Sequence, residues 1–157
     1  MKLTDFVVRE AIVPSLAATD RNGAIREIVA ALATAGRLSP DDAETISKAV
    51  IQRENQGSTG FGKGVAVPHV KHEKVPSIMA AVGCSAAGID FAALDRAPVY
   101  SIVVLLSPPQ DPDVHLQAME NIFRQLQRDR FRRFLRQSET ADAIWELFEE
   151  ADEQPAG

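Results

Sequence analysis

The sequence predicts an α/β protein in which one sheet is covered by helices on both faces. Two apolar stretches, 78–86 (IMAAVGCSA) and 99–107 (VYSIVVLLS), predict strands, and amphipathic helical patterns precede and follow them. With 157 residues, of which 45% are apolar and 25% charged, the chain can bury a sizeable core. Because we find no repeat and no linker, we expect one domain over 1–150 and a disordered acidic tail over 151–157.

The first half of the chain contains clear helix start signals. A short helix is expected near 3–8, and the proline in 11–16 (AIVPSL) allows at best a short or edge strand there. Asp20 is expected to cap a helix that stops at Gly36, and Ser39 with Pro40 begins another that ends near 53–54.

The second half begins with a glycine-rich segment. Residues 55–64 (NQGSTGFGKG) are expected to form a loop and 65–67 a short strand, and 88–98 is a turn-rich connection between the two main strands.

Three helices are expected to close the chain. Asp111 caps the first, with Pro112 at its first position. The inward stripe of this helix, spaced by 4, 3 and 4 residues, is His115, Met119, Ile122 and Leu126. A shorter helix is expected from about Arg130 and a last one from about Glu139. The inward residues of the last helix are Ile144, Trp145 and Phe148.

Charge and composition argue against several classes of protein. The net charge of -5 disfavours nucleic acid as the main partner. The single cysteine, Cys84, allows no intrachain disulfide and is typical of a reducing compartment. No apolar run approaches the roughly 20 residues of a membrane span, and the first ten residues lack the apolar core of a signal peptide. We therefore expect a cytoplasmic protein.

His69 is the strongest candidate functional residue. It follows a proline at the end of a short predicted strand, where sites are commonly built. The loop before it offers the hydroxyls of Ser58 and Thr59, and glycines that let the backbone approach a small anion. These glycines are Gly60, Gly62 and Gly64. A neutral imidazole attacks well near neutral pH, and Arg53 precedes the loop as a cation for a phosphoryl group on His69.

Other interpretations of the histidines remain open. His69 and His72, with Cys84 or His115, could bind zinc, but His72 lies in a charged turn and no Cys-x-x-Cys or His-Glu-x-x-His spacing supports a metal. His115 begins a helix and faces inward, so it is either a positioned hydrogen-bond partner or a histidine packed for stability. A helix N-terminus disfavours the imidazolium, so we expect His115 to stay neutral.

The stretch 54–70 (ENQGSTGFGKGVAVPHV) resembles the active-site signature of enzyme IIA components of the bacterial sugar phosphotransferase system, fructose–mannitol class. The positions that match at the required spacing are Glu54, Phe61, Gly62, Val65, Ala66, Val67, Pro68 and His69. Val70 stands where a glycine, alanine or cysteine is usual. The resemblance extends through 88–99 (GIDFAALDRAPV) to the His-Leu pair of the next helix, and it is greatest to the stand-alone nitrogen-regulatory branch.

This resemblance implies an α/β/α sandwich around a mixed sheet of four to five strands, in a IIA type-2 domain. It implies that His69 is phosphorylated by a histidine phosphocarrier protein, with Arg53 and His115 as the other catalytic residues. Loop residues expected to bind the phosphoryl group are Ser58, Thr59, Gly62 and Gly64. Transfer between two histidines is nearly balanced and needs alignment rather than a metal or an organic cofactor.

Two function classes are consistent with such a phosphotransferase. In a regulator, the phosphorylation state of His69 decides which target, such as a transporter or a kinase, is bound. In a sugar-transport IIA, the group passes to a cysteine of a IIB component of a fructose/mannitol-type permease. The absence of a fused IIB or IIC domain and of a membrane span favours the regulator.

Six of the seventeen basic residues lie in one short segment near the C-terminus. They are Arg124, Arg128, Arg130, Arg132, Arg133 and Arg136. A solvated helical face is the favoured interpretation, a docking surface for an acidic partner is the alternative, and RNA binding is a third. We expect no nucleic-acid partner and no insertion into a membrane.

Overall fold

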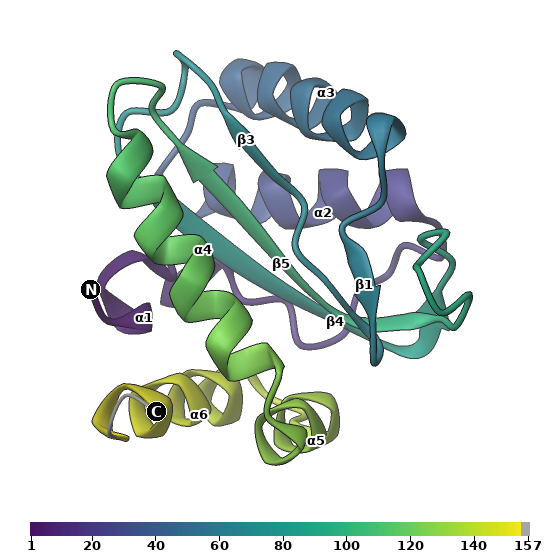
Figure 1. Cartoon of the computed structure of the whole chain (residues 1–157). Helices are drawn as coiled ribbons and strands as arrows, with labels where there is room; N and C mark the ends of the chain where they lie inside the picture. The colour runs from purple at the N-terminus through teal and green to yellow at the C-terminus, as the bar shows by residue number, and fades with distance from the viewer. Residues whose placement is uncertain (155–157) are drawn as a thin grey trace.

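The computed structural model describes residues 1–154, which fold into a sheet between helices (Figure 1). In chain order the elements are α1 (Leu3–Phe6), η1 (Arg9–Ala11, a 3₁₀-helix), α2 (Arg21–Thr34), α3 (Pro40–Gln56), β1 (Gly60–Gly62), β2 (Val65–Ala66), β3 (His69–Lys71), β4 (Met79–Ile89), β5 (Val99–Ser107), α4 (Pro112–Leu126), α5 (Asp129–Gln137) and α6 (Ala141–Glu153).

The helix start signals work as the sequence predicts, with one exception. The Asp20 carboxylate accepts a 2.7 Å hydrogen bond from the N–H of Gly23, and Ser39 caps α3 in the same way. Asp111 occupies the position before α4, but its side chain makes no capping bond because its backbone (φ -119°, ψ 61°) departs from the usual extended conformation. Thr140 caps α6, so this helix begins at Ala141 rather than near Glu139.

β5 is the central strand of a mixed sheet. β4 pairs with it antiparallel, whereas β2 and β3 both pair with its other edge in parallel. Val65 lies opposite Ser101 and His69 opposite Leu105, so β2 and β3 keep one register. Pro68 has no N–H to donate, yet its carbonyl still accepts a 2.9 Å bond from Leu105. The two strands are therefore pieces of one extended segment, and His69 follows the break.

The segment 55–64 is not entirely a loop as the sequence predicts. Its end forms β1, which pairs antiparallel with β2, and Lys63 and Gly64 make the turn with φ of 63° and 78°. A three-residue Gly-Phe-Gly strand carries no alternating apolar pattern that could have revealed it. The segment 11–16 does lie at an edge of the sheet, because Val13 bridges Gly83 of β4 in parallel.

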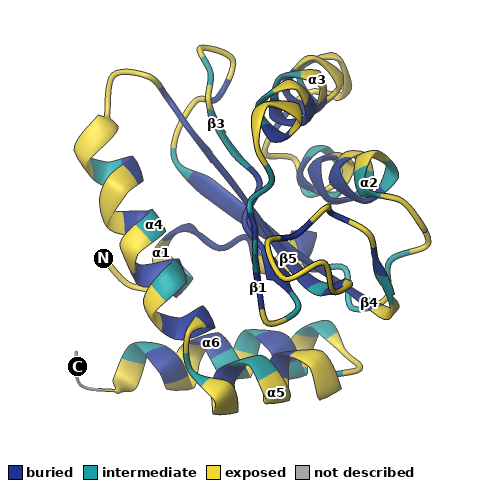
Figure 2. Cartoon of the chain, turned by 45° about the vertical axis from the view of Figure 1, so that its right-hand side comes forward, coloured by how far each residue is buried: buried dark blue, intermediate teal, exposed yellow. Residues whose placement is uncertain are grey.

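Helices cover both faces of the sheet, as the α/β/α prediction requires (Figures 1 and 2). Alternate residues of β5 point to opposite faces. Ile102, Val104 and Leu106 pack in a first core with α2 and α3, whereas Val103 and Leu105 belong to a second core with α1, α4, α5 and α6. Both cores thus share one strand, and the site lies where this strand ends.

The end of the chain differs from the predicted acidic tail. α6 continues to Glu153, and Ala151 is buried in the second core. The carboxylate of Asp152 accepts hydrogen bonds from the N–H groups of Leu3 and Thr4 at 2.7 and 3.0 Å and so caps α1. The helix thus occupies the start of the segment that was expected to be disordered, and 155–157 of this prediction lie outside the described residues.

Candidate active site

His69 lies in a cleft of about 890 Å³ formed by residues of α3, β3 and α4. The imidazole is half-buried, and its Nδ1 lies 2.8 Å from the carbonyl oxygen of Val67. A carbonyl oxygen only accepts hydrogen bonds, so Nδ1 must carry the proton in this contact. Nε2 then keeps its lone pair and is the ring nitrogen of His69 that is able to act as a nucleophile.

His115, in the first turns of α4, lies beside His69. The two ring centroids are 5.7 Å apart and the rings are inclined by 52°. His115 is buried, with 7% of its surface exposed, and its Nδ1 is hydrogen-bonded to the fully buried hydroxyl of Ser107. Ser107 ends β5, so the central strand of the sheet holds the second histidine in place.

The Ser107 contact fixes the tautomer of His115. A buried hydroxyl hydrogen without an acceptor costs about 1–3 kcal/mol, and His115 Nδ1 is the acceptor that this hydroxyl reaches within the described part of the chain. Ser107 therefore donates to Nδ1, and Nε2 carries the ring proton. Burial, the charge of His69 and the charge of Lys71 lower the pKa of His115 to about 4, so the ring is neutral near pH 7. His115 is therefore neutral, as the sequence predicts, and burial is the main cause of its low pKa.

Arg53, in the last turn of α3, lines the same cleft. It is half-buried, and its Nη1 donates a 3.1 Å bond to the carbonyl of Gly57. Lys71 and Arg124 add two positive charges to the cleft walls against the single carboxylate of Glu120. The cleft is thus positive within a chain of net charge -5, which favours a doubly charged phosphoryl group.

The loop residues that the sequence assigns to phosphate binding do not line this cleft. Ser58 donates its hydroxyl to the carbonyl of Phe91 at 2.6 Å, and Thr59 donates to the buried carboxylate of Glu54 at 2.9 Å. The other two residues, Gly62 and Gly64, face Asp95 and Tyr100. The two hydroxyls shape the loop that leads to His69, and the assignment of these four residues to phosphate binding stays a prediction.

Two of the alternative metal ligands, Cys84 and His72, do not line the cleft, whereas His115 does. Cys84 is buried in the second core and lies opposite Ser101 in the sheet, whereas His69 lies opposite Leu105. Burial raises the pKa of the Cys84 thiol to about 11. His72 is not among the residues that line the cleft, and its Nδ1 accepts a bond from the N–H of Lys74. Within residues 1–154 no three His, Cys, Asp or Glu side chains gather as a metal site would need.

The sequence interpretation missed Ser107 and the apolar part of the cleft. A polar residue directly after the apolar run 102–106 was the available signal for Ser107. Met119 and Phe123 line the cleft together with Leu116, which is 57% exposed. Val70, at the position where the signature has a small residue, is also part of the lining. An exposed apolar rim around a reactive side chain is typical of a surface that receives a protein partner.

Comparison with protein families identifies the family of this chain. Residues 5–151 match the family described as phosphoenolpyruvate-dependent sugar phosphotransferase system, EIIA 2. The chain belongs to this family. The family predicted from the His69 signature is therefore confirmed, and this family takes part in phosphoryl transfer.

Curated relatives of this EIIA 2 chain include regulatory and sugar-specific proteins. The nitrogen regulatory protein of Bradyrhizobium diazoefficiens is 33% identical over 147 residues, which cover 94% of each chain. The fructose-specific EIIABC component of Bacillus subtilis is 30% identical over 152 residues, or 97% of this chain. The chain spans only 24% of that larger protein.

Solved structures confirm the fold. The nitrogen regulatory protein IIA-Ntr of Neisseria meningitidis superimposes with a TM-score of 0.82 at 24% identity, covering 92% of this chain and 97% of its own. The mannitol IIA of Escherichia coli, solved in complex with phosphorylated IIB, has a TM-score of 0.74 at 19% identity, covering 90% and 95%. No helix in residues 1–154 has both the length and the apolar character needed to cross a membrane.

Proposed function

We propose that this EIIA 2 protein is a phosphoryl carrier in which Nε2 of His69 accepts the phosphoryl group from a phosphohistidine of a carrier protein. The observation that supports this most directly is the bond from His69 Nδ1–H to the Val67 carbonyl, because it leaves the Nε2 lone pair available in an open, positive cleft. The new Nε2–P bond forms as the N–P bond of the donor breaks, and the donor nitrogen regains its electron pair. Nδ1 keeps its proton throughout, so the step needs no general base.

Two neighbours act on the phosphoryl oxygens in this proposal. Arg53 offers a guanidinium, which matches phosphate oxygens as a rigid fork of donors. His115 offers its Nε2–H as a neutral donor whose orientation is set by Ser107. A neutral donor at this place stabilises the charge on the group without holding it as firmly as a second cation would, which suits a carrier that must release it.

The rim of the cleft supports a protein as the donor of the group. Leu116, Met119 and Phe123 supply apolar surface on α4, and Arg124 lies beside them. Phe123 is fixed by an aromatic contact with Phe61 of β1, with ring centroids 5.0 Å apart. An apolar surface with a basic residue and a rigid aromatic anchor suits a protein–protein contact, and we assign it to the histidine phosphocarrier protein.

We further propose that the carrier is regulatory, so that phosphorylation of His69 changes its affinity for a target such as a transporter or kinase. The nitrogen regulatory relative, which aligns over 94% of both chains, supports this assignment. A role in sugar transport is the second candidate, because the fructose-specific relative joins A, B and C components and the mannitol IIA binds phosphorylated IIB. If phosphorylated protein transfers its phosphoryl group to a IIB cysteine as fast as sugar transport requires, the second candidate is favoured.

The experiment that tests the carrier function is phosphorylation with phosphoenolpyruvate, the general phosphotransferase enzyme and a carrier protein. Acid-labile label should appear on the wild type and on His72→Ala, a matched control that removes a histidine outside the cleft. It should be absent from His69→Ala. Label that persists in His69→Ala, or NMR that shows phosphorus on Nδ1 rather than Nε2, would contradict the assignment.

A further inference from the structure

A second hollow, of about 610 Å³, lies at the opposite end of the parallel strands from His69. Val65 of β2 and Ser101 of β5 line the hollow. His69 follows Val65 along the β2–β3 segment, and Ser107 follows Ser101 along β5. Val65 and His69 are separated by roughly 13 Å along the strand. Residues of α5 form the other wall, and Figure 1 shows this helix remote from β3. The proposed phosphoryl-transfer site therefore does not use this hollow.

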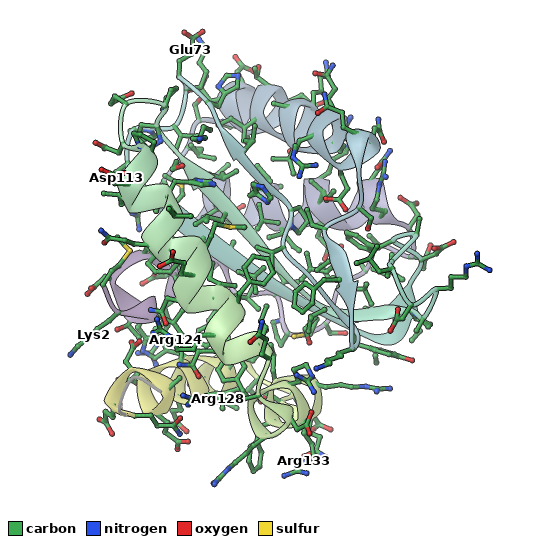
Figure 3. The ribbon with its side chains drawn as sticks, in the orientation of Figure 1. Lys2, Glu73, Asp113, Arg124, Arg128 and Arg133 are labelled. Atoms are coloured by element: carbon green, nitrogen blue, oxygen red, sulfur yellow. The ribbon has the colours of Figure 1, made fainter. Side chains whose placement is uncertain are left out.

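The hollow collects positive charge that its own carboxylates compensate only in part. Its basic side chains are Lys63, Arg132, Arg133 and Arg136. Of its two carboxylates, Asp95 accepts the N–H groups of Lys63 and Ala97 at 3.1 and 3.0 Å, and Asp129 pairs with Arg132. Within the described residues, the side chains of Lys63, Arg133 and Arg136 form no ion pair. Figure 3 shows Arg133 projecting from α5 into solvent.

Arg136 is held in a fixed orientation by Tyr100. Its guanidinium carbon lies 3.5 Å from the centre of the Tyr100 ring. That ring is confined by two glycines, because a Cβ on Gly64 would come within 3.1 Å of Cδ2 and one on Gly88 within 3.0 Å of Cε1. A guanidinium stacked on an aromatic face keeps its N–H donors in its own plane, free for a bidentate acceptor. The donors of Arg136 are thus oriented before any ligand arrives.

Arg132 gives the wall of the hollow a second fixed cation. Its side chain is only 13% exposed, and its Nη1 donates a 2.8 Å bond to the carbonyl of Leu126 at the end of α4. Asp129 neutralises Arg132, and Asp95 offsets one of the three other basic residues, so four positive and two negative side chains leave the hollow a net charge of +2. Such a hollow matches a ligand with two or more closely spaced negative charges better than a single carboxylate.

We propose that this hollow binds a small molecule that carries two or more linked phosphate groups. Linked phosphates concentrate several charges and acceptor oxygens within a few ångströms, which suits the fixed fork of Arg136 beside Arg133 and Lys63. The hollow is also of the size usual for small-molecule sites, about 300–1,000 Å³. The arginine segment noted in the sequence is therefore more than a solvated helical face.

The proposal is tested by calorimetric titration of the full chain with inorganic triphosphate at constant ionic strength. The wild type should bind one equivalent saturably, and Arg136→Gln should bind at least about tenfold more weakly. Tyr100→Phe, which keeps the ring, should bind like the wild type, whereas Tyr100→Leu should be weakened with Arg136 still present. Arg130→Gln is the matched control, because Arg130 lies on the same helix but does not line the hollow and instead lies over Phe134.

Three results would overturn the proposal. One is the absence of saturable triphosphate binding to the wild type. Another is an equal loss of triphosphate affinity in Arg130→Gln and Arg136→Gln, which would indicate attraction by the overall positive charge of α5 rather than a specific site. The third is binding of single-stranded RNA that depends on Arg136 and is not displaced by triphosphate. Loading of His69 should proceed normally in Arg136→Gln, so this assay confirms folding and separates failure here from failure of the carrier proposal.

Discussion

His115 makes the stability of the folded protein depend on pH, because its pKa differs between the folded and the unfolded chain. Burial, His69 and Lys71 lower the folded pKa to about 4, below the unfolded value near 6.5. The unfolded chain therefore binds more protons between these values, and stability present above pH 6.5 is lost as the pH falls toward 4.

We expect the wild type to lose about 2 kcal/mol more stability than His115→Gln between pH 7 and pH 5. Urea unfolding of both proteins at the two pH values measures this, because the remaining titrating groups are common to both. An NMR titration should place the His115 pKa well below the value of about 6.5 of an unperturbed imidazole. An equal loss of stability in the two proteins would show that His115 is not held neutral by its surroundings.

Arg53 and His115 are expected to serve different halves of the transfer. Arg53→Ala removes the fork of donors for the charged group, so loading by the carrier should slow roughly 10- to 100-fold and the phosphorylated form should hydrolyse sooner. His115→Ala should still load but discharge poorly, since the neutral donor that guides release is missing. Loading and discharge are measured as separate steps. Wild-type rates for both variants in both steps would contradict these roles.

The sequence predicted three residues of one site, and the structure places them in one cleft, but their supports could not be predicted. His69, Arg53 and His115 could be singled out because each has a strong local signal: a Pro-His pair, a helix end and a helix start. The supports depend on contacts between distant segments. Ser107 meets His115 only because β5 leads directly into α4, and Ser58 and Thr59 turn inward because Phe91 and Glu54 accept their hydroxyls.

At the scale of elements, the junction between α3 and β1 depends on one buried carboxylate. Glu54 is 2% exposed and accepts both the N–H and the hydroxyl of Thr59, at 2.7 and 2.9 Å. Glu54→Ala leaves these two donors unsatisfied and should cost about 2–4 kcal/mol of unfolding free energy. Glu54→Gln, which can still accept from the N–H of Thr59, should cost much less. Urea unfolding compares the two, and equal losses would show that the charge of Glu54, which both substitutions remove, matters rather than its bond to the N–H of Thr59.

Element type was predictable where the signal is local. Asp20 and Ser39 set helix starts by accepting a hydrogen bond from the N–H three residues further on, and Pro40 occupies the first helical position. The apolar runs of β4 and β5 are longer than a turn, so they indicate strands. The break between β2 and β3 and the pairing of β1 could not be predicted in this way. β2 and β3 pair with β5, more than thirty residues away, whereas β1 pairs with β2. Strands of two or three residues have no periodicity to detect.

The whole molecule is organised around β5, which gives alternate side chains to the two cores. Ile102, Val104 and Leu106 serve the face with α2 and α3, and Val103 and Leu105 serve the other. Loss of either helical layer would expose one face of the same strand. The two cores should therefore unfold together rather than one after the other.

Trp145, the only tryptophan, allows this coupling to be measured. It packs against the second core from α6, whereas Ile28 is fully buried in the first core on α2. Ile28→Ala should cost about 2–5 kcal/mol, which for a domain of this size lowers the melting temperature by roughly 4–20 °C. Because the cores share β5, the fluorescence of Trp145 should report the same lowered midpoint as far-UV circular dichroism. Phe148→Ala, in the second core, should likewise lower both midpoints together. If Ile28→Ala lowered the circular dichroism midpoint but left the Trp145 transition unchanged, the two layers would be independent folding units and the central role of β5 would be wrong.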